Sequence, residues 1–397
     1  MKILVAGELP DATLEQLRAL ALEVAYRPDL TAAALRDGVA DVGILVVENL
    51  RVSPDVIDRA PSLQMIVHAG HGPGDVALEA ASSAGIFVTH CPDKSGEAVA
   101  EHAFGLLLAL DRGVVDHTLA LRDGRWQRGD IAARGLAGRT LGIVGWGPVG
   151  RLVARRAHAF GMRVVAWSAA LNTDGPSEVP VEFCPWPREL ARQCDLVIVL
   201  SVEGEREPVV DEEFLAGLPE GAYLVHVGRG GPVDEHALVQ AIERRGLRVA
   251  LDAFAAEPAG DTGRFRSRLL ELSGVIGTPH VAELTTQARQ ATAAEVVRVI
   301  RGFVVGGEVL NCLNLCERSP ATWQLLLRVK DQPGVLAAIL DVVRADGINA
   351  QEISSRVFLG ARASWITIAL DERPSSEALD SIRTLASVLH LELRAVV

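Results

Sequence analysis

Several features of secreted and membrane proteins are missing from this sequence of 397 residues. It has no uninterrupted apolar run of about 18 residues, the length that a transmembrane helix needs. Residues 1–7 read as a strand and a turn, without the long apolar segment of a signal peptide. The 5 cysteines are scattered, and no other Cys or His completes a metal set with Cys312 and Cys316. We therefore expect a cytoplasmic protein with reduced thiols, no membrane segment and no metal site.

Positive charge is also scarce, since the formal net charge is −12. This balance argues against nucleic acid and anionic membranes as partners. An anionic small molecule would need a local positive pocket built from a few placed arginines and histidines. The length, with 49% hydrophobic and 23% charged residues, indicates a globular protein of two or three domains.

Strands alternate with helices along most of the chain, which predicts parallel sheets covered on both faces. The first predicted strands are 3–6, 42–47, 65–68 and 87–89. A long helix from 95 to 110, continuing toward 122, leads to predicted strands at 141–144, 163–167, 196–200, 223–227, 249–253 and 275–277. A helix over 284–304 is then expected to return the chain to the first sheet.

The last part of the chain follows a different pattern after a linker at 311–320. Strands at 324–329, 349–358, 363–370 and 391–397, with helices at 335–345 and 376–388, form a βαββαβ unit. We therefore predict an α/β protein with two doubly wound parallel-sheet domains, one flavodoxin-like and one Rossmann, plus a ferredoxin-like domain. The predicted boundaries are 1–95 with 285–318, then 96–284, then 322–397.

The motif GWGPVG at 145–150 follows an apolar strand and precedes a helical pattern. This order is typical of dinucleotide-binding folds. Gly145 permits the tight turn, Gly147 lets a pyrophosphate approach the backbone, and Gly150 lets the helix lie close to the strand. The N-terminus of the helix then offers free N–H groups to the phosphates.

Further motifs in a fixed order resemble the D-isomer-specific 2-hydroxyacid dehydrogenases. They are HAGHG at 68–72, VAE at 99–101, VGRGG at 227–231, LDAFAAEP at 251–258 and TPH at 278–280. The resemblance implies NAD(P)-dependent interconversion of a 2-hydroxy acid and a 2-oxo acid, and it is strongest for the phosphoglycerate dehydrogenase branch. The tail, with DQPG at 331–334 and GIN at 347–349, resembles an ACT domain, a small amino-acid-sensing module.

Reduction of a 2-oxo acid requires a proton for the carbonyl oxygen and a cation that holds the carboxylate. His280 is the candidate acid and base, since imidazole titrates near neutral pH, and Glu257 is expected to bond it and favour its protonated form. Arg229 follows a strand end, and its planar fork suits a carboxylate together with a carbonyl oxygen. The resemblance gives these positions the same roles, although each residue alone would read as an ordinary surface or turn residue.

The substrate carboxylate is expected at the turn of Ala69, Gly70, His71 and Gly72, whose backbone N–H groups suit an anion. A plain strand-to-helix turn is the alternative. Phosphoglycerate enzymes often carry arginines in the loop at 46–51, where this chain has only Arg51, and Glu48 there would repel a phosphate. Hydroxypyruvate, glyoxylate or another 2-oxo acid is therefore the alternative substrate.

The resemblance assigns the rest of the cofactor site to Pro148, Val149, Ser168, Ser201, Val227, Gly228 and Asp252. Asp252 is expected near the nicotinamide amide, or else as a cap of the next turn. Ser168 stands where many dinucleotide folds place Asp or Glu on the ribose 2′-hydroxyl. Because no arginine follows at 169–172, the cofactor is expected to be NAD or NADP. Glu283 is an unusual charge beside the expected nicotinamide position.

In the ACT-like tail, Asp331 and Asn349 occupy places where sensing relatives touch an amino-acid effector. Val329 stands where serine-sensing relatives can have a histidine, so a structural role in holding dimers together is the alternative. We expect a homo-oligomer, either a dimer or a tetramer. A nucleotide-sensing, corepressor-like binding protein is the rival of another class, and the presence of Arg229, Glu257 and His280 weighs against it.

Overall fold

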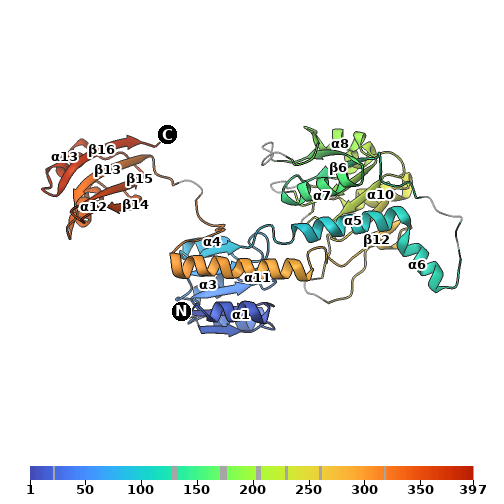
Figure 1. The fold of residues 1–397 in the computed structure, drawn as a ribbon, viewed down its shortest axis with the longest axis horizontal. Helices are drawn as coiled ribbons and strands as arrows, with labels where there is room; N and C mark the ends of the chain where they lie inside the picture. Colours follow the sequence, from blue (N-terminus) through green and yellow to red (C-terminus); the bar gives the residue numbers. More distant parts are fainter. Residues whose placement is uncertain are drawn as a thin grey trace. The chain divides into compact units, whose positions relative to one another are not determined.

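The computed structural model describes residues 1–20, 23–126, 128, 133–169, 177–202, 207–228, 231–258, 262–316 and 319–396. The chain divides into two compact units, Met1–Leu313 and Asn314–Val397 (Figure 1). Within the described ranges, no helix is long and apolar enough to cross a membrane. No group of His, Cys, Asp and Glu in those ranges is arranged to hold a metal ion.

The first sheet of the larger unit has parallel strands in the order β2-β1-β3-β4-β5. The strands are β1 (Lys2–Ala6), β2 (Glu23–Tyr26), β3 (Ile44–Val47), β4 (Met65–His68) and β5 (Phe87–His90). The helices between them are α1 (Asp11–Arg18), α2 (Ala32–Gly38), α3 (Pro54–Asp58) and α4 (Leu78–Ser83). The sequence pattern misses β2 and α2. No residue of β2 is buried, so the continuous apolar run that marks a central parallel strand is absent.

Helices cover both faces of this sheet. One face packs under α2, α3 and α4, and the other under α1 and α11 (Thr286–Arg301). Val296 and Ile300 of α11 pack with Ile3 and Val5 of β1, so α11 returns the chain to the first sheet as predicted. The helix ends in a π-turn, Gly302–Gly306, close to the predicted end.

The second sheet of the larger unit has parallel strands in the order β12-β11-β10-β9-β6-β7-β8. They are β6 (Thr140–Val144), β7 (Arg163–Trp167), β8 (Glu182–Phe183), β9 (Leu196–Val199), β10 (Tyr223–His226), β11 (Arg248–Leu251) and β12 (Val275–Gly277). The connecting helices are α7 (Pro148–Ala159), α8 (Pro187–Gln193), α9 (Glu212–Gly217), α10 (Glu235–Arg245) and η1 (Leu269–Glu271). Because the strand order reverses between β6 and β9, the carboxyl ends of these two strands form the switch point where such sheets bind ligands.

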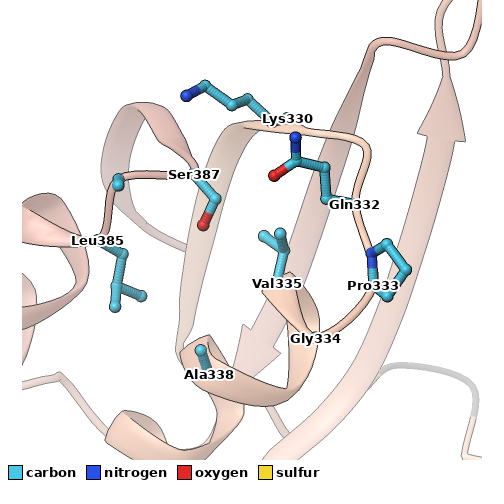
Figure 2. A pocket seen from close by; sticks show the side chains of 9 residues that line it. Lys330, Gln332, Pro333, Gly334, Val335, Ala338, Leu385 and Ser387 are labelled. Atoms are coloured by element: carbon cyan, nitrogen blue, oxygen red, sulfur yellow. The ribbon is translucent and has the colours of Figure 1, made fainter.

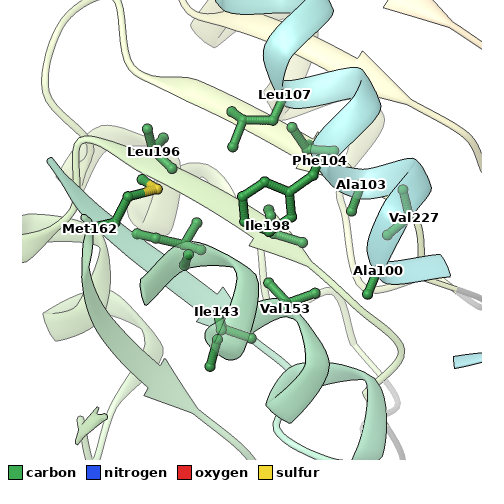
Figure 3. Close-up of a cluster of buried hydrophobic side chains, with 14 of the residues drawn as sticks. Ala100, Ala103, Phe104, Leu107, Ile143, Val153, Met162, Leu196, Ile198 and Val227 are labelled. Atoms are coloured by element: carbon green, nitrogen blue, oxygen red, sulfur yellow. The ribbon is translucent and has the colours of Figure 1, made fainter. Parts of the chain in front are cut away.

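The helix α5 (Gly96–Arg112) lies on the core of this second sheet (Figure 3). Phe104 and Leu107 of α5 pack with Ile143 of β6 and Ile198 of β9, all of them buried. The prediction of one helix continuing toward 122 is wrong. Gly113 has a left-handed φ of 58°, which ends α5, and a separate helix α6 (Val114–Arg122) begins there.

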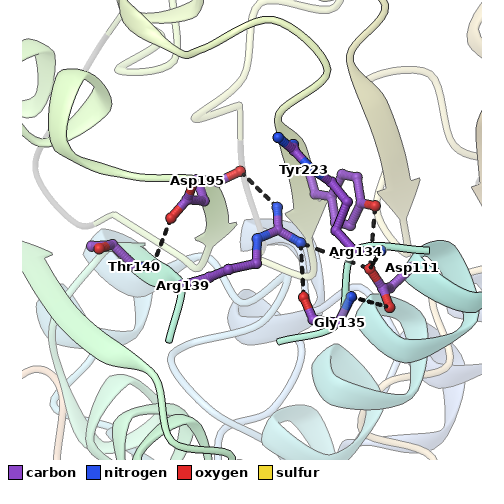
Figure 4. Close-up of polar contacts among 7 residues, drawn as sticks. All are labelled: Asp111, Arg134, Gly135, Arg139, Thr140, Asp195 and Tyr223. Atoms are coloured by element: carbon purple, nitrogen blue, oxygen red, sulfur yellow. Dashed lines mark hydrogen bonds and ion pairs between the residues drawn. The ribbon is translucent and has the colours of Figure 1, made fainter. Parts of the chain in front are cut away.

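A buried polar cluster ties the amino-terminal edge of the second sheet to α5 (Figure 4). Asp111, 2% exposed, accepts hydrogen bonds from the backbone N–H groups of residues 134 and 135 and from the Tyr223 hydroxyl. The Arg139 guanidinium lies 3.7 Å from Asp111 and 4.5 Å from the centre of the Tyr223 ring. Because the cluster lies at the edge opposite to the strand carboxyl ends, its role is to hold the core together.

The smaller unit is a four-stranded antiparallel sheet in the order β14-β15-β13-β16. Its elements are β13 (Trp323–Lys330), α12 (Val335–Ala345), β14 (Ala350–Val357), β15 (Ala363–Leu370), α13 (Ser376–Thr384) and β16 (Val388–Ala395). Apolar residues of both helices pack on one face of the sheet. The predicted βαββαβ pattern and its ferredoxin-like arrangement are therefore present.

Candidate active site

The glycine loop after β6 has the geometry that a dinucleotide requires. Gly145 has a φ of 95°, and a Cβ on it would lie 2.7 Å from the backbone oxygen of Ser201. A Cβ on Gly150 would lie 3.1 Å from the oxygen of Gly145, so glycine there favours the close packing of α7 against β6. A Cβ on Gly147 would meet nothing within 4 Å, which leaves the approach to the N-terminus of α7 open. Pro148, which has no N–H to leave unpaired, begins that helix, and Val149 follows in its first turn.

The other predicted cofactor residues lie at strand ends of the same sheet. Ser168 follows β7, and its hydroxyl lies 3.5 Å from the backbone oxygen of Trp146. Val227 and Gly228 follow β10, and a Cβ on Gly228 would lie 2.2 Å from the carbonyl carbon of Leu200. Only glycine at 228 lets the loops after β9 and β10 pack this closely.

The predicted pair of His280 and Glu257 is formed. Nδ1 of His280 lies 2.8 Å from Oε2 of Glu257, and the two side chains are 35% and 31% exposed. The other carboxylate oxygen of Glu257 accepts the backbone N–H of Phe254 at 2.8 Å. The carboxylate is thus fixed on its own loop, and Nε2 of His280 is left for a reacting group.

Asp252 organises the turn that carries His280. Its carboxylate, 1% exposed, accepts the backbone N–H groups of Val281 at 3.0 Å and Ala282 at 2.9 Å. The Thr278 hydroxyl donates to it at 2.5 Å. These bonds hold His280 at a left-handed φ of 51°, a conformation that non-glycine residues keep where surrounding contacts impose it. They support the capping role, while a contact with nicotinamide stays a prediction.

Two further histidines surround this turn and have no signature in the sequence. His102 of α5 places Nε2 2.9 Å from the Thr278 hydroxyl oxygen and 3.3 Å from Asp252. His226, the last residue of β10, is 5% exposed, and its Nδ1 has no hydrogen-bond partner among the residues that the structure describes. Burial lowers the pKa of His226 to about 4. A hydrogen bond to the Val199 backbone and the nearby carboxylate of Asp252 act in the opposite direction and raise this pKa, but by less than burial lowers it. His226 is therefore a neutral imidazole beside the candidate active site.

Arg229, the predicted substrate cation, lies outside the described residues together with its neighbour at 230. Its expected role stays a prediction. Glu283 is described, and its Oε2 accepts a hydrogen bond from Ser95 at 3.3 Å, just before the start of α5. Its carboxylate thus bonds the strand-to-helix connection that leads from the first sheet to the second.

The predicted substrate loop of Ala69, Gly70, His71 and Gly72 follows β4 and wraps around the side chain of His68. Arg51, predicted to help bind a phosphate, is 69% exposed at its side chain and lies 3.8 Å from Asp75. Asp75 would therefore compete with a substrate phosphate for Arg51, the one basic side chain of the 46–51 loop.

The predicted effector residues of the smaller unit do not line its surface hollow of about 360 Å³ (Figure 2). That hollow is lined by Lys330, Gln332, Pro333, Gly334, Val335, Ala338, Leu385, Ala386 and Ser387. Asp331 lies between two lining residues. Asn349 is paired at a strand start, where its backbone N–H donates to Asp371 at 3.0 Å.

The doubly wound sheet and the open glycine loop at its switch point define a protein with a Rossmann dinucleotide fold. Residues 104–282 match the family model of the D-isomer specific 2-hydroxyacid dehydrogenase NAD binding domain. The chain is 31% identical over 330 residues to the glyoxylate reductase of Thermococcus onnurineus. The aligned region covers 78% of this chain and 97% of that protein. The chain belongs to the D-isomer specific 2-hydroxyacid dehydrogenase family.

Two further relatives differ in the activity that their names state. The chain is 33% identical over 318 residues to the D-3-phosphoglycerate dehydrogenase of Methanocaldococcus jannaschii. The aligned region covers 79% of this chain and 60% of that protein. It therefore spans less than two thirds of that relative. The solved structure of an NADPH-dependent glyoxylate/hydroxypyruvate reductase from Sinorhizobium meliloti, in complex with citrate, is 30% identical with a TM-score of 0.68, and covers 79% of this chain and 97% of that one.

Proposed function

We propose that this protein is a dehydrogenase that interconverts a 2-hydroxy acid and a 2-oxo acid with NAD or NADP. The observation that carries the proposal is the contact of 2.8 Å between His280 and Glu257 on a turn fixed by Asp252. An imidazole that is held by a carboxylate at one nitrogen and open at the other is arranged for proton transfer. Membership of the family supports the same reaction.

Each group has a defined task in the proposed reduction. The Nδ1–H of His280 donates to Glu257, so protonated His280 presents its Nε2–H to the carbonyl oxygen of the 2-oxo acid. As the carbonyl oxygen gains negative charge, it takes the proton from Nε2 of His280. Before this transfer, the carboxylate of Glu257 stabilises the imidazolium. Arg229 holds the substrate carboxylate, and the middle of the loop at 69–72 lies against the same anion.

The residues of the glycine loop fit a nicotinamide dinucleotide. The open space at Gly147 and the free N–H groups at the start of α7 suit a pyrophosphate, while Ser168, Ser201, Val227 and Gly228 lie at the neighbouring strand ends. When bound, the nicotinamide supplies or accepts the hydride. Ser168 carries no charge that would exclude a 2′-phosphate, so the proposal includes both NAD and NADP.

The first candidate substrate is 3-phosphohydroxypyruvate with its reduced form 3-phosphoglycerate, as the name of the M. jannaschii relative states for that protein. The second is an unphosphorylated acid such as hydroxypyruvate or glyoxylate. A specific observation favours the second. The only basic side chain of the 46–51 loop, Arg51, is exposed and has Asp75 3.8 Å away, and Glu48 stands in the same loop.

The test is the initial rate of NADH and NADPH oxidation with 3-phosphohydroxypyruvate, hydroxypyruvate, glyoxylate and 2-oxoglutarate. A dominant kcat/KM with the phosphorylated acid identifies a phosphoglycerate dehydrogenase. Preference for hydroxypyruvate or glyoxylate identifies a reductase of small 2-oxo acids. If neither cofactor is oxidised with any of them, the dehydrogenase proposal is wrong, and a nucleotide-sensing role becomes the better account.

The smaller unit is proposed to be an ACT-like regulatory domain. Support comes from its βαββαβ topology and from the hollow lined by Lys330 and Gln332, the neighbours of Asp331 in sequence (Figure 2). L-serine added to the same assays tests it, and a change of KM or kcat is expected if the hollow binds an amino acid. We also propose a homo-oligomer, because α6 exposes apolar side chains at Val115 (41%) and Leu119 (51%), followed by Trp126 (81%).

A further inference from the structure

The loop at 69–74 is built around the ring of His68. This histidine ends β4 and is 5% exposed. Its Nδ1 lies 2.8 Å from the carbonyl oxygen of Gly72, and its Nε2 lies 3.1 Å from the carbonyl oxygen of Glu48. One imidazole therefore joins the loop after β3 to the loop after β4, and these are the two loops assigned to substrate binding.

Glycines let the second loop close on this ring. A Cβ on Gly70 would lie 2.8 Å from the Cε1 atom of His68, and one on Gly74 would lie 2.7 Å from its Nε2 atom and 2.8 Å from its Cδ2 atom. Glycine at both positions lets the loop pack against the ring, and each ring nitrogen lies within hydrogen-bond distance of a carbonyl oxygen. Rotating the ring by half a turn would put ring carbons in the places of Nδ1 and Nε2, and both hydrogen bonds would be lost.

The hydrogen-bond partners determine the charge of this ring. A carbonyl oxygen only accepts, so a ring nitrogen that faces one must carry a hydrogen. Neutral imidazole has a single N–H, which would leave the second nitrogen lone pair against a carbonyl lone pair at about 3 Å. The imidazolium form satisfies both contacts.

A neighbouring histidine has the opposite requirement. His90, the last residue of β5, accepts the backbone N–H of Gly72 at Nδ1, 3.0 Å away. That nitrogen must be bare, so His90 is neutral. The ring of His71 meets His90 edge-on with centroids 5.6 Å apart. Gly72 is thus held by two imidazoles, one through its carbonyl and one through its N–H.

We propose that His68 is held as an imidazolium whose buried charge makes the 69–72 loop a receptor for the carboxylate of the substrate. This inference rests on the proposed function. In a chain of net charge −12, the loop needs a local cation to attract a 2-oxo acid. His68 is a positioning residue, because it acts through the loop. It occupies the carbonyl oxygens of Gly72 and Glu48, which would otherwise repel an anion. The N–H groups of Ala69 and Gly72 already donate to Val47 and His90, so the substrate carboxylate is proposed to bind at the middle of the loop, residues 70–71.

The other charged or titratable groups of these loops are Glu48 and Arg51 after β3, His71 and Asp75 after β4, and His90 at the end of β5. Arg51 and Asp75 lie 3.8 Å apart. Their opposite charges therefore offset each other in the field at the loop.

Nitrogen NMR of the full chain with labelled histidine tests the charge directly. At pH 7.5 the signals of His68, assigned by their loss in His68→Gln, are expected to show two protonated ring nitrogens. His90, assigned through His90→Gln, is expected to show one bare nitrogen. A His68 signal typical of a neutral tautomer would overturn the proposal, whatever the activity of the protein.

Binding of two nearly isosteric inhibitors tests the role in recognition. Oxamate carries a carboxylate, whereas oxamide is uncharged. In His68→Gln, which keeps donor groups without the charge, oxamate is expected to bind about tenfold more weakly while oxamide is unaffected. The KM for the preferred 2-oxo acid should rise by a similar factor, with kcat changed less than twofold. His158→Gln, an exposed position at the end of α7, is the matched control.

Equal losses for oxamate and oxamide would show that His68 only maintains the loop, and would overturn its electrostatic role. If wild-type protein reduces no 2-oxo acid, the proposed function fails, and the NMR result still decides the charge of His68. If His68→Gln does not fold, the His68 ring signals are assigned in the wild-type protein through their couplings to the backbone of residues 67–69. Their state with and without oxamate then replaces the kinetic comparison. Absence of any change at His68 and Gly72 on oxamate binding would then contradict the proposal.

Discussion

The contact between Glu257 and His280 is the residue-scale feature on which the proposed chemistry depends. Glu257→Gln removes the charge that stabilises the imidazolium but keeps a group of the same shape. We expect kcat for the preferred 2-oxo acid to fall about 10- to 100-fold, with KM changed little, because proton transfer is affected and binding is not. Steady-state kinetics with NADH or NADPH measure both constants.

The matched control for this variant is Glu235→Gln. Glu235 also accepts a backbone N–H of the same segment, that of Ala255 at 2.7 Å, yet it belongs to α10. A similar fall in kcat for both variants would mean that Glu257 matters only for the shape of its loop.

His226 makes a second prediction at this scale, which concerns stability and pH. Its pKa is lowered to about 4 by burial, from an ordinary value of 6.5. The unfolded chain therefore binds a proton before the folded chain does, and stability is lost as the pH falls from 6.5 towards 4. The expected loss from this group is about 2 kcal/mol by pH 5.

His226→Asn removes the titrating group, so its unfolding free energy should fall less between pH 7 and pH 5 than that of wild type. Urea unfolding at the two pH values measures the difference. His236→Asn, on the exposed side of α10, controls for the loss of a histidine. If wild type and His226→Asn show the same pH dependence, His226 is not buried in its neutral form.

Motifs predicted the residues whose role is local and missed those whose role depends on packing. His280, Glu257 and Asp252 stand in short segments that a motif can mark, and the structure brings them together. His226 and His102 act through neighbours far away in the sequence, and so does His68 in its contact with Glu48. Only the strand register, which places His68 beside His90 and next to the Glu48 loop, shows what these histidines contact.

At the scale of elements, the junction of β6 and α7 separates two uses of glycine. Gly145 is required by conformation, whereas Gly147 is extended, with a φ of −175°, and has open space around it. Gly147→Ala is therefore expected to fold normally and to bind NADH and NADPH at least tenfold more weakly, because a methyl group would stand where the pyrophosphate approaches. Fluorescence titration measures the affinity and thermal unfolding measures the stability.

Gly145→Ala is the contrasting variant. Its methyl group would meet the oxygen of Ser201, and its φ of 95° is unfavourable for alanine, so a loss of stability of about 1–2 kcal/mol or more is expected. Normal cofactor affinity in Gly147→Ala would place the pyrophosphate elsewhere and would contradict the assigned cofactor site.

The buried central strands were predicted well, and the two strands that were missed lie at sheet edges. The apolar runs of β3, β4, β9 and β10 mark central strands because both of their faces are covered. The edge strands β2 and β8 have exposed or half-buried residues and lack that signal. The break between α5 and α6 depends on the left-handed conformation of Gly113, and the helical periodicity on both sides hides it.

At the scale of the whole molecule, the two units have separate cores and different kinds of sheet. The comparisons reported above cover about four fifths of this chain, which leaves room for a unit that those relatives need not share. The division of labour we propose, chemistry in the larger unit and regulation in the smaller one, follows from this architecture. Neither the fold nor the family determines the substrate, because that choice depends on a few side chains in the loops after β3 and β4.

The proposed oligomer provides a prediction at this scale. The apolar side chains of Val115 and Leu119 on α6 cost free energy in water, and a second copy of the chain would cover them. Leu119→Asp places a charge in that face, and we expect it to convert the oligomer to a monomer. Light scattering on a sizing column measures the mass.

Val305→Asp is the control, because Val305 is an exposed apolar residue (74%) on a different element, the π-turn after α11. The same change to aspartate at this exposed position should leave the mass of the oligomer unchanged. If Leu119→Asp has the same mass as wild type, α6 is not the contact surface. If wild type is itself a monomer, the homo-oligomer proposal is wrong.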